Sequence, residues 1–144
     1  MQGSKFLKVT GILMIIFGAI ALVFSIIALA GVGVLAAMGA PSGLLLGAGL
    51  LALLGSVAEF VAGIIGVKNW NTPEKAQTCI VWGFIVIAFC IISNILTLVG
   101  YPENFNVISL LTGLVIPVLY LVGAFKNKNM SANAAAAVNV QAAE

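Results

Sequence analysis

Residues 44–67 read LLLGAGLLALLGSVAEFVAGIIGV, an apolar run interrupted by one charged residue, Glu59. A helix needs about 20 predominantly apolar residues to cross the hydrocarbon core of a bilayer. The run lacks the alternating polar positions of a half-buried strand and is too long for a fully buried one. It therefore predicts a transmembrane helix, because backbone groups in lipid must be hydrogen-bonded within their own segment.

Three further runs have the same character, at about residues 9–30, 77–99 and 105–125. Short connections between apolar helices favour antiparallel neighbours. We therefore predict an all-α fold, an antiparallel bundle of four transmembrane helices over residues 1–128. Residues 129–144 form an Ala-rich tail that we expect to fray, because an isolated helix of this length is marginal in water. We interpret residues 31–43 as an extension of the first helix and a turn, with a re-entrant segment as the alternative.

The composition excludes several classes of protein. Hydrophobic residues make up 62% of the chain and charged residues 7%, against about 25% charged in soluble domains. The charged residues are six Lys and four Glu, without Arg, Asp or His. No basic patch is available to neutralise nucleic-acid phosphates, and no nucleophile–base pair is evident. We expect neither an enzyme, nor a metal or cofactor site, nor a nucleic-acid partner.

The six lysines predict the orientation. They precede the first span, separate the second from the third, or follow the fourth, so four spans would place all of them on one side. The positive-inside rule puts that side in the cytoplasm. We therefore expect both termini inside, with Trp70 and Trp82 at the inner boundary and Tyr101 at the outer one. The lysines are Lys5, Lys8, Lys68, Lys75, Lys126 and Lys128.

Small residues recur at helical spacing in the first two spans. Close packing of small residues, rather than the hydrophobic effect, brings helices together in lipid. The pattern predicts that the first two spans pack through these stripes, within one chain or between copies of it. The stripes are Gly11, Gly18 and Ser25 in the first span, and Ala48, Ala52, Gly55, Glu59, Ala62 and Gly66 in the second.

Glu59 is the one ionisable acid or base inside the predicted spans. It precedes Lys68 by nine residues, which places it about 13 Å inside the membrane. An intramembrane carboxylate is costly and is a functional hypothesis by default. Three interpretations stay open: a protonated hydrogen-bond donor between helices, with Tyr120 or the backbone near Pro117 as partner; an acid lining a wet cavity or pore; or the coupling site of a small proton-driven exporter.

The third span contains the remaining polar candidates. Asn94 lies about 10 Å inside Tyr101, and Asn at that depth usually bonds to another helix; a substrate role is the alternative. Cys79 and Cys90 are eleven residues apart on the same predicted helix, about 16 Å, which is beyond disulfide reach. We expect both to be free thiols.

The second hairpin carries a resemblance. Glu59, residues 62–68 (AGIIGVK), residues 72–76 (TPEKA), Cys79 and Gly83 resemble small uncharacterised four-helix membrane proteins of bacteria. The resemblance implies a four-span fold and no particular activity.

These observations predict a non-enzymatic multi-pass membrane protein that works through helix packing and self-associates into a homo-oligomer in the lipid bilayer. The alternative is an oligomeric channel or a proton-linked small transporter that uses Glu59 to bind a small ion or a proton.

Overall fold

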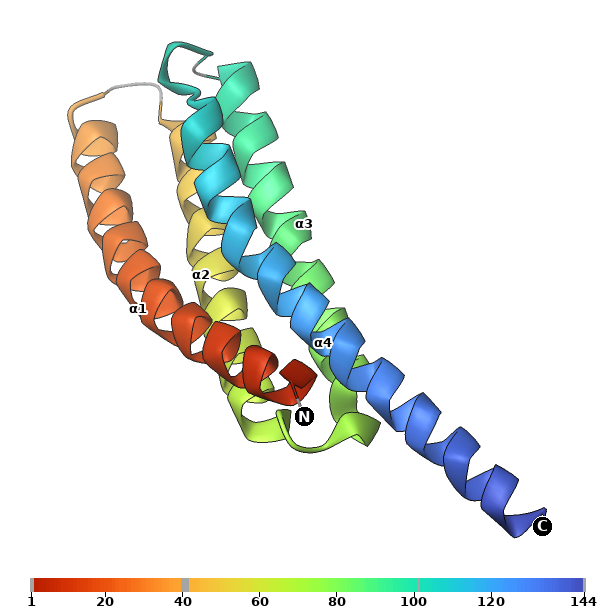
Figure 1. The fold of residues 1–144 in the computed structure, drawn as a ribbon. Helices are drawn as coiled ribbons and strands as arrows, with labels where there is room; N and C mark the ends of the chain where they lie inside the picture. The colour runs from red at the N-terminus through yellow and green to blue at the C-terminus, as the bar shows by residue number, and fades with distance from the viewer. Residues whose placement is uncertain (1, 40–41, 101, 144) are drawn as a thin grey trace.

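The computed structural model describes residues 2–39, 42–100 and 102–143, which form a bundle of four long helices joined by short connections (Figure 1). All four helices are long and apolar enough to cross a membrane, which is compatible with the predicted multi-pass architecture. No strand occurs within the described ranges. The helices are α1 (Gln2–Ala37), α2 (Gly43–Asn69), α3 (Ala76–Gly100) and α4 (Val107–Ala142), with short 3-10 helices η1 (Pro73–Lys75) and η2 (Pro102–Asn104) in two connections.

Most helix ends extend beyond the predicted spans, whereas α4 begins at Val107, two residues after the predicted start. α1 continues to Ala37, which confirms the extended first helix, and Gly39 then takes a positive φ of 81° that favours glycine over other residues. The expected turn at Ala40–Pro41 and the expected interfacial Tyr101 lie outside the described residues. α4 continues through the Ala-rich tail, so the expectation that this tail frays is wrong. Alanine has the highest helix propensity, and extending an existing helix avoids the cost of nucleation.

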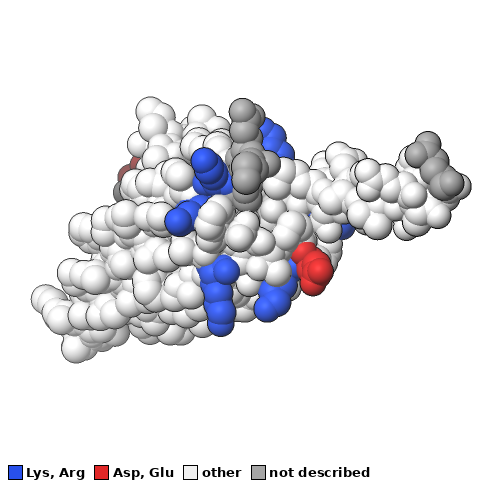
Figure 2. Space-filling view, turned by 60° about the horizontal axis from the view of Figure 1, so that its bottom comes forward, with Lys and Arg blue, Asp and Glu red and all other residues white. Residues whose placement is uncertain are grey.

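The helices are arranged in chain order around the bundle. Each packs against the next, and α4 also packs against α1. Figure 1 places the α1–α2 and α3–α4 connections at one end, and the α2–α3 connection with the start of α1 at the other. Figure 2 views the molecule from the latter side and shows lysine side chains gathered there, so we call it the lysine end.

Glycines allow α1 and α2 to approach closely. A Cβ atom on Gly18 would lie 2.8 Å from the backbone nitrogen of Phe60, and one on Gly63 would lie 2.8 Å from the Gly11 carbonyl oxygen. Farther from the lysine end, the Ser25 and Ser56 hydroxyls are 3.3 Å apart. The first-span stripe therefore faces α2 as predicted.

The small residues of α2 face elsewhere, which corrects the predicted pairing of the two stripes. The nearest neighbour of a Cβ on Gly55 is Phe89 of α3, and a Cβ on Gly66 would collide with the Tyr120 ring of α4. At Gly55 and Gly66 the α2 stripe therefore faces α3 and α4 in the bundle interior, and not α1. Near-uniform hydropathy around α2 gives the sequence no signal for this rotation.

The packed core lies in the half of the bundle nearer the lysine end. The opposite half contains fewer buried side chains, and several of them are serines, including Ser25 and Ser56. Packing is thus tight near the lysine end and looser toward the other end. The buried hydrophobic residues are Leu7, Met14, Ala58, Ala62, Ala76, Cys79, Ile80, Val86, Tyr120, Leu121 and Ala124.

Candidate functional site

Glu59 lies near the middle of α2 and is half-buried. Its side chain lines two adjoining hollows in the bundle. Within the described parts of the chain, no hydrogen bond or ion pair joins the Glu59 carboxyl group to another side chain or to the backbone. A buried polar group usually has a partner, because leaving it unpaired in a low-dielectric environment is costly. The geometry therefore leaves this carboxyl group open to an external partner.

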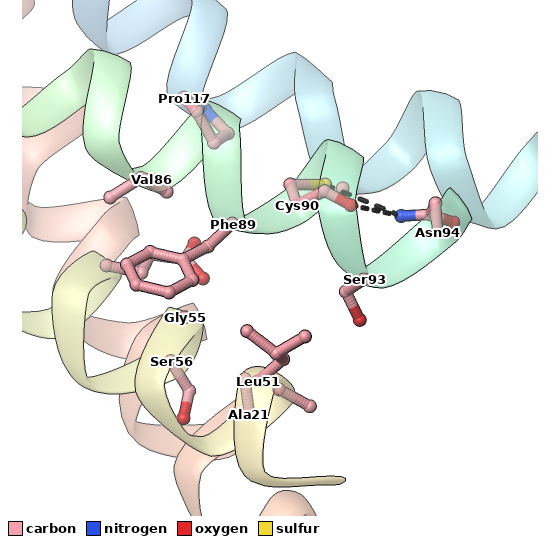
Figure 3. Close-up of a pocket in the computed structure, with 13 residues that line it drawn as sticks. Ala21, Leu51, Gly55, Ser56, Val86, Phe89, Cys90, Ser93, Asn94 and Pro117 are labelled. Atoms are coloured by element: carbon pink, nitrogen blue, oxygen red, sulfur yellow. Dashed lines mark hydrogen bonds between the residues drawn. The ribbon is translucent and has the colours of Figure 1, made fainter. Parts of the chain in front are cut away.

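The first hollow, which we call the central cavity, has a volume of about 180 Å³ and is walled by all four helices. Its polar groups come from two facing helices, Ser56 and Glu59 of α2 and Cys90, Ser93 and Asn94 of α3. Figure 3 shows Phe89 beside Gly55 and the Ser93 side chain directed toward α2. Its other lining residues are Ala21, Leu51, Ala52, Gly55, Val86, Phe89, Gly113 and Pro117.

Pro117 shapes the α4 wall of the central cavity. Proline lacks a backbone N–H, so it cannot donate to the carbonyl oxygen four residues earlier, which belongs to Gly113. Both residues line the cavity. Gly113 has no side chain, and a Cβ atom there would lie 3.5 Å from the Cys90 sulfur. α4 thus contributes a wall without a side chain at Gly113, whose carbonyl lacks its usual helical donor.

The second hollow, which we call the α1–α4 groove, has a volume of about 780 Å³. It shares Ala21, Glu59 and Gly113 with the central cavity, so the two hollows adjoin at the carboxylate. α1 and α4 meet near the lysine end, where a Cβ atom on Gly123 would lie 3.1 Å from the Leu7 Cα. They separate toward the other end (Figure 1). The remaining lining residues are Phe17, Ile108, Ser109, Leu111, Thr112, Val115 and Ile116.

Tyr120 closes the bundle on the lysine side of Glu59. Its hydroxyl donates to the Ala62 carbonyl oxygen at 2.8 Å, and its ring covers Gly66. Tyr120 is therefore not the partner of Glu59 that one interpretation expects, because within the described residues no hydrogen bond joins the two side chains and the Tyr120 hydroxyl bonds to α2 instead. Tyr120 is fully buried, as are Leu7 and Met14 of α1. Packed side chains thus separate Glu59 from the lysine end.

Asn94 also differs from its prediction. Its Nδ2 atom donates to the Cys90 carbonyl oxygen at 2.7 Å, within α3, rather than to another helix. The residue nevertheless lines the central cavity (Figure 3). The preceding turn therefore satisfies the amide donor and leaves the side chain at the cavity wall.

The two cysteines are free, as predicted, and lie in different environments. Cys79 is fully buried on the lysine side of the bundle, with its sulfur 4.0 Å from the Ile65 carbonyl oxygen. Cys90 lines the central cavity. The sequence predicts neither this difference nor the place of Phe89 in the cavity wall. Ser93 and Asn94 follow Cys90 by three and four residues, and this spacing predicts that all three lie on one side of the helix.

Of the predicted α2 stripe, Ala52 and Gly55 line the central cavity, and Ala62 and Gly66 contact Tyr120. Ala48 is half-buried and lines neither hollow. The structure therefore gathers Glu59 and Asn94 at one cavity and separates them from Tyr120.

No protein-family model, curated protein or solved structure matches this chain. The resemblance of the second hairpin to small bacterial membrane proteins therefore stays a prediction.

Proposed function

We propose that this chain is a non-enzymatic, proton-linked membrane carrier in which Glu59 binds a proton and a cationic substrate alternately. The observation that supports this proposal is the unpartnered Glu59 carboxyl group at the junction of two hollows. A carboxylate in a low-dielectric site attracts a cation or takes up a proton, and the two compete for the same oxygens. Such competition couples the movement of one to the movement of the other.

In the proposed topology neighbouring helices run antiparallel. Both termini and the α2–α3 connection lie in the cytoplasm of a bacterial cell. The lysines at one end of the bundle support it through the positive-inside rule. In this orientation the packed half containing Tyr120 faces the cytoplasm, and the central cavity extends from Glu59, near the middle of the membrane, toward the outer side. The arrangement corresponds to an outward-facing state of a carrier.

A carrier fits this geometry better than a channel or a structural role for Glu59. A channel within one copy requires a continuous wet path, whereas fully buried Leu7, Met14 and Tyr120 fill the lysine half. A role as a hydrogen-bond donor between helices requires an acceptor, and within the described residues the Glu59 carboxyl group bonds to neither expected partner, Tyr120 or the backbone near Pro117. Both alternatives therefore have less support than proton-linked transport.

Self-association stays a separate prediction. Gly11, Gly18 and Gly63 have their close contacts within one chain, so the first-span stripe gives no argument for a second copy.

The test is cation–proton exchange in proteoliposomes that contain a pH-sensitive dye. Addition of tetraethylammonium, ethidium or dodecyltrimethylammonium to the parent protein should change the internal pH. Glu59→Gln should slow this change by roughly ten-fold or more, because loss of a coupling group removes the linkage between the two ligands. Glu103→Gln is the matched control, since Glu103 is exposed in the η2 connection, and it should exchange like the parent.

Two results would contradict the proposed function. One is an absence of exchange by the parent protein with all three cations. The other is exchange by Glu59→Gln at the parent rate, which would separate the carboxylate from the activity.

A further inference from the structure

The α1–α4 groove differs in chemistry from the central cavity it adjoins. Apolar side chains dominate the groove, with Phe17 on α1 and Leu111, Val115 and Ile116 on α4. The central cavity instead presents the Glu59 carboxyl group together with hydroxyl, thiol and amide groups. The two hollows meet at Ala21, Glu59 and Gly113. A ligand that occupies both would need a polar end and an apolar end.

The charges define the polar end. Glu59 is the one charged side chain lining either hollow, and its carboxyl group has no partner in the described residues. Pro117 deprives the Gly113 carbonyl of its usual helical donor, and Gly113 lines both hollows. A carboxylate as the only charged group fits a cationic head group and disfavours an anionic one.

The shape and position of the groove define the apolar end. Its α4 wall runs from Ile108 to Ile116, about 12 Å along the helix, which suits an extended alkyl chain. Several wall residues are exposed on the bundle surface, including Ile108, Leu111 and Val115. In a chain that crosses the bilayer, an exposed apolar surface at this level faces lipid rather than water. The groove therefore lies on the route between the hydrocarbon phase and Glu59.

From this juxtaposition we infer that the α1–α4 groove is a lateral entrance, through which a single-chain amphiphile with a cationic head group reaches Glu59 from the outer leaflet of the bilayer. The head group occupies the central cavity beside Glu59, and the alkyl chain stays in the groove between α1 and α4. This inference rests on the proposed function and names its substrate class and entry route.

The natural cysteine in the central cavity provides the readout. A Cys79→Ala background in lipid nanodiscs leaves Cys90 as the single thiol, and its rate of reaction with a maleimide reports access to the cavity. Dodecyltrimethylammonium is the amphiphilic probe, and tetramethylammonium is the same head group without the alkyl chain. We expect the amphiphile to slow Cys90 labelling by roughly ten-fold at a concentration about ten times its dissociation constant, and tetramethylammonium to do so only at much higher concentration.

Two tryptophan substitutions on α4 provide the matched comparison. Val115 lines the groove, whereas Val118, one turn later, lines neither hollow, and both are exposed. Val115→Trp should fill the groove and abolish protection of Cys90 by dodecyltrimethylammonium. Val118→Trp should retain protection, because its side chain lies on another part of the exposed surface. Glu59→Gln should weaken protection roughly ten-fold or more through loss of the ion pair.

The possible results separate the two proposals. Equal protection in Val115→Trp and Val118→Trp would overturn the lateral entrance, as would an absence of protection in the parent protein. Either result, together with Glu59-dependent cation–proton exchange in proteoliposomes, would leave the proposed function in place. Loss of that exchange would remove the proposed function itself.

Discussion

The Tyr120 ring of α4 covers Gly66 of α2, and the Tyr120 hydroxyl donates to the Ala62 carbonyl oxygen at 2.8 Å. This contact joins two helices that lie diagonally across the bundle. It is possible only because position 66 has no side chain. It packs the bundle on the lysine side of Glu59, whereas the two hollows that Glu59 lines lie on its other side.

Gly66→Ala should therefore destabilise the protein although alanine favours helix formation by about 1 kcal/mol. The added Cβ would collide with the Tyr120 ring, and overpacking of this kind typically costs about 1–3 kcal/mol. Thermal unfolding in detergent measures the effect. Gly47→Ala is the control on the same helix, because a Cβ there meets nothing within 4 Å, and it should be neutral or stabilising. Equal stability of the two variants would contradict the close contact.

Asn127 provides a second stability prediction. It is fully buried on α4, and neither its Oδ1 nor its Nδ2 atom has a hydrogen-bond partner among the described residues. A buried unpaired amide costs about 1–3 kcal/mol. Asn127→Leu, which keeps the branching of the side chain and removes its polar atoms, should therefore raise the free energy of unfolding in detergent by about 1 kcal/mol. A loss of stability would instead indicate a bound water or another polar partner.

The lysine end predicts which side of the membrane can be labelled. Lys68 and Lys75 are exposed and flank the α2–α3 connection. A membrane-impermeant amine reagent should modify them in inside-out vesicles and not in intact cells, because lysines are retained on the cytoplasmic side. Glu103→Lys, in the η2 connection at the other end, is the reporter for the outside and should be modified in intact cells. Modification of Lys68 or Lys75 from outside intact cells would invert the proposed orientation.

The sequence predicts the number of spans well, because length and hydropathy decide whether a helix crosses a bilayer. It also identifies Glu59, since a single carboxylate stands out within an apolar run. It does not predict how each helix is rotated about its axis. α2 and α3 are apolar on nearly every face, so no hydrophobic stripe indicates which side faces the interior. For this reason the expected partners of Gly55, Gly66 and Tyr120 differ from those in the structure.

The Ala-rich tail shows a different limit. Its composition predicts weak helix formation in isolation, but α4 enters it as an established helix and continues to Ala142. The composition of the tail alone does not show that a helix already formed in the preceding segment continues into it.

The central claim is that the cavity around Glu59 is accessible from outside the cell while the opposite half is packed. Cys90 and Cys79 lie on either side of this division on the same helix, one lining the cavity and the other fully buried. The most direct measurement is the rate at which a membrane-impermeant maleimide labels each single-cysteine variant, Cys79→Ala and Cys90→Ala, in intact cells. We predict rapid labelling of Cys90 and negligible labelling of Cys79. A Cys90 as unreactive as Cys79, or one labelled only in inside-out vesicles, would contradict the account.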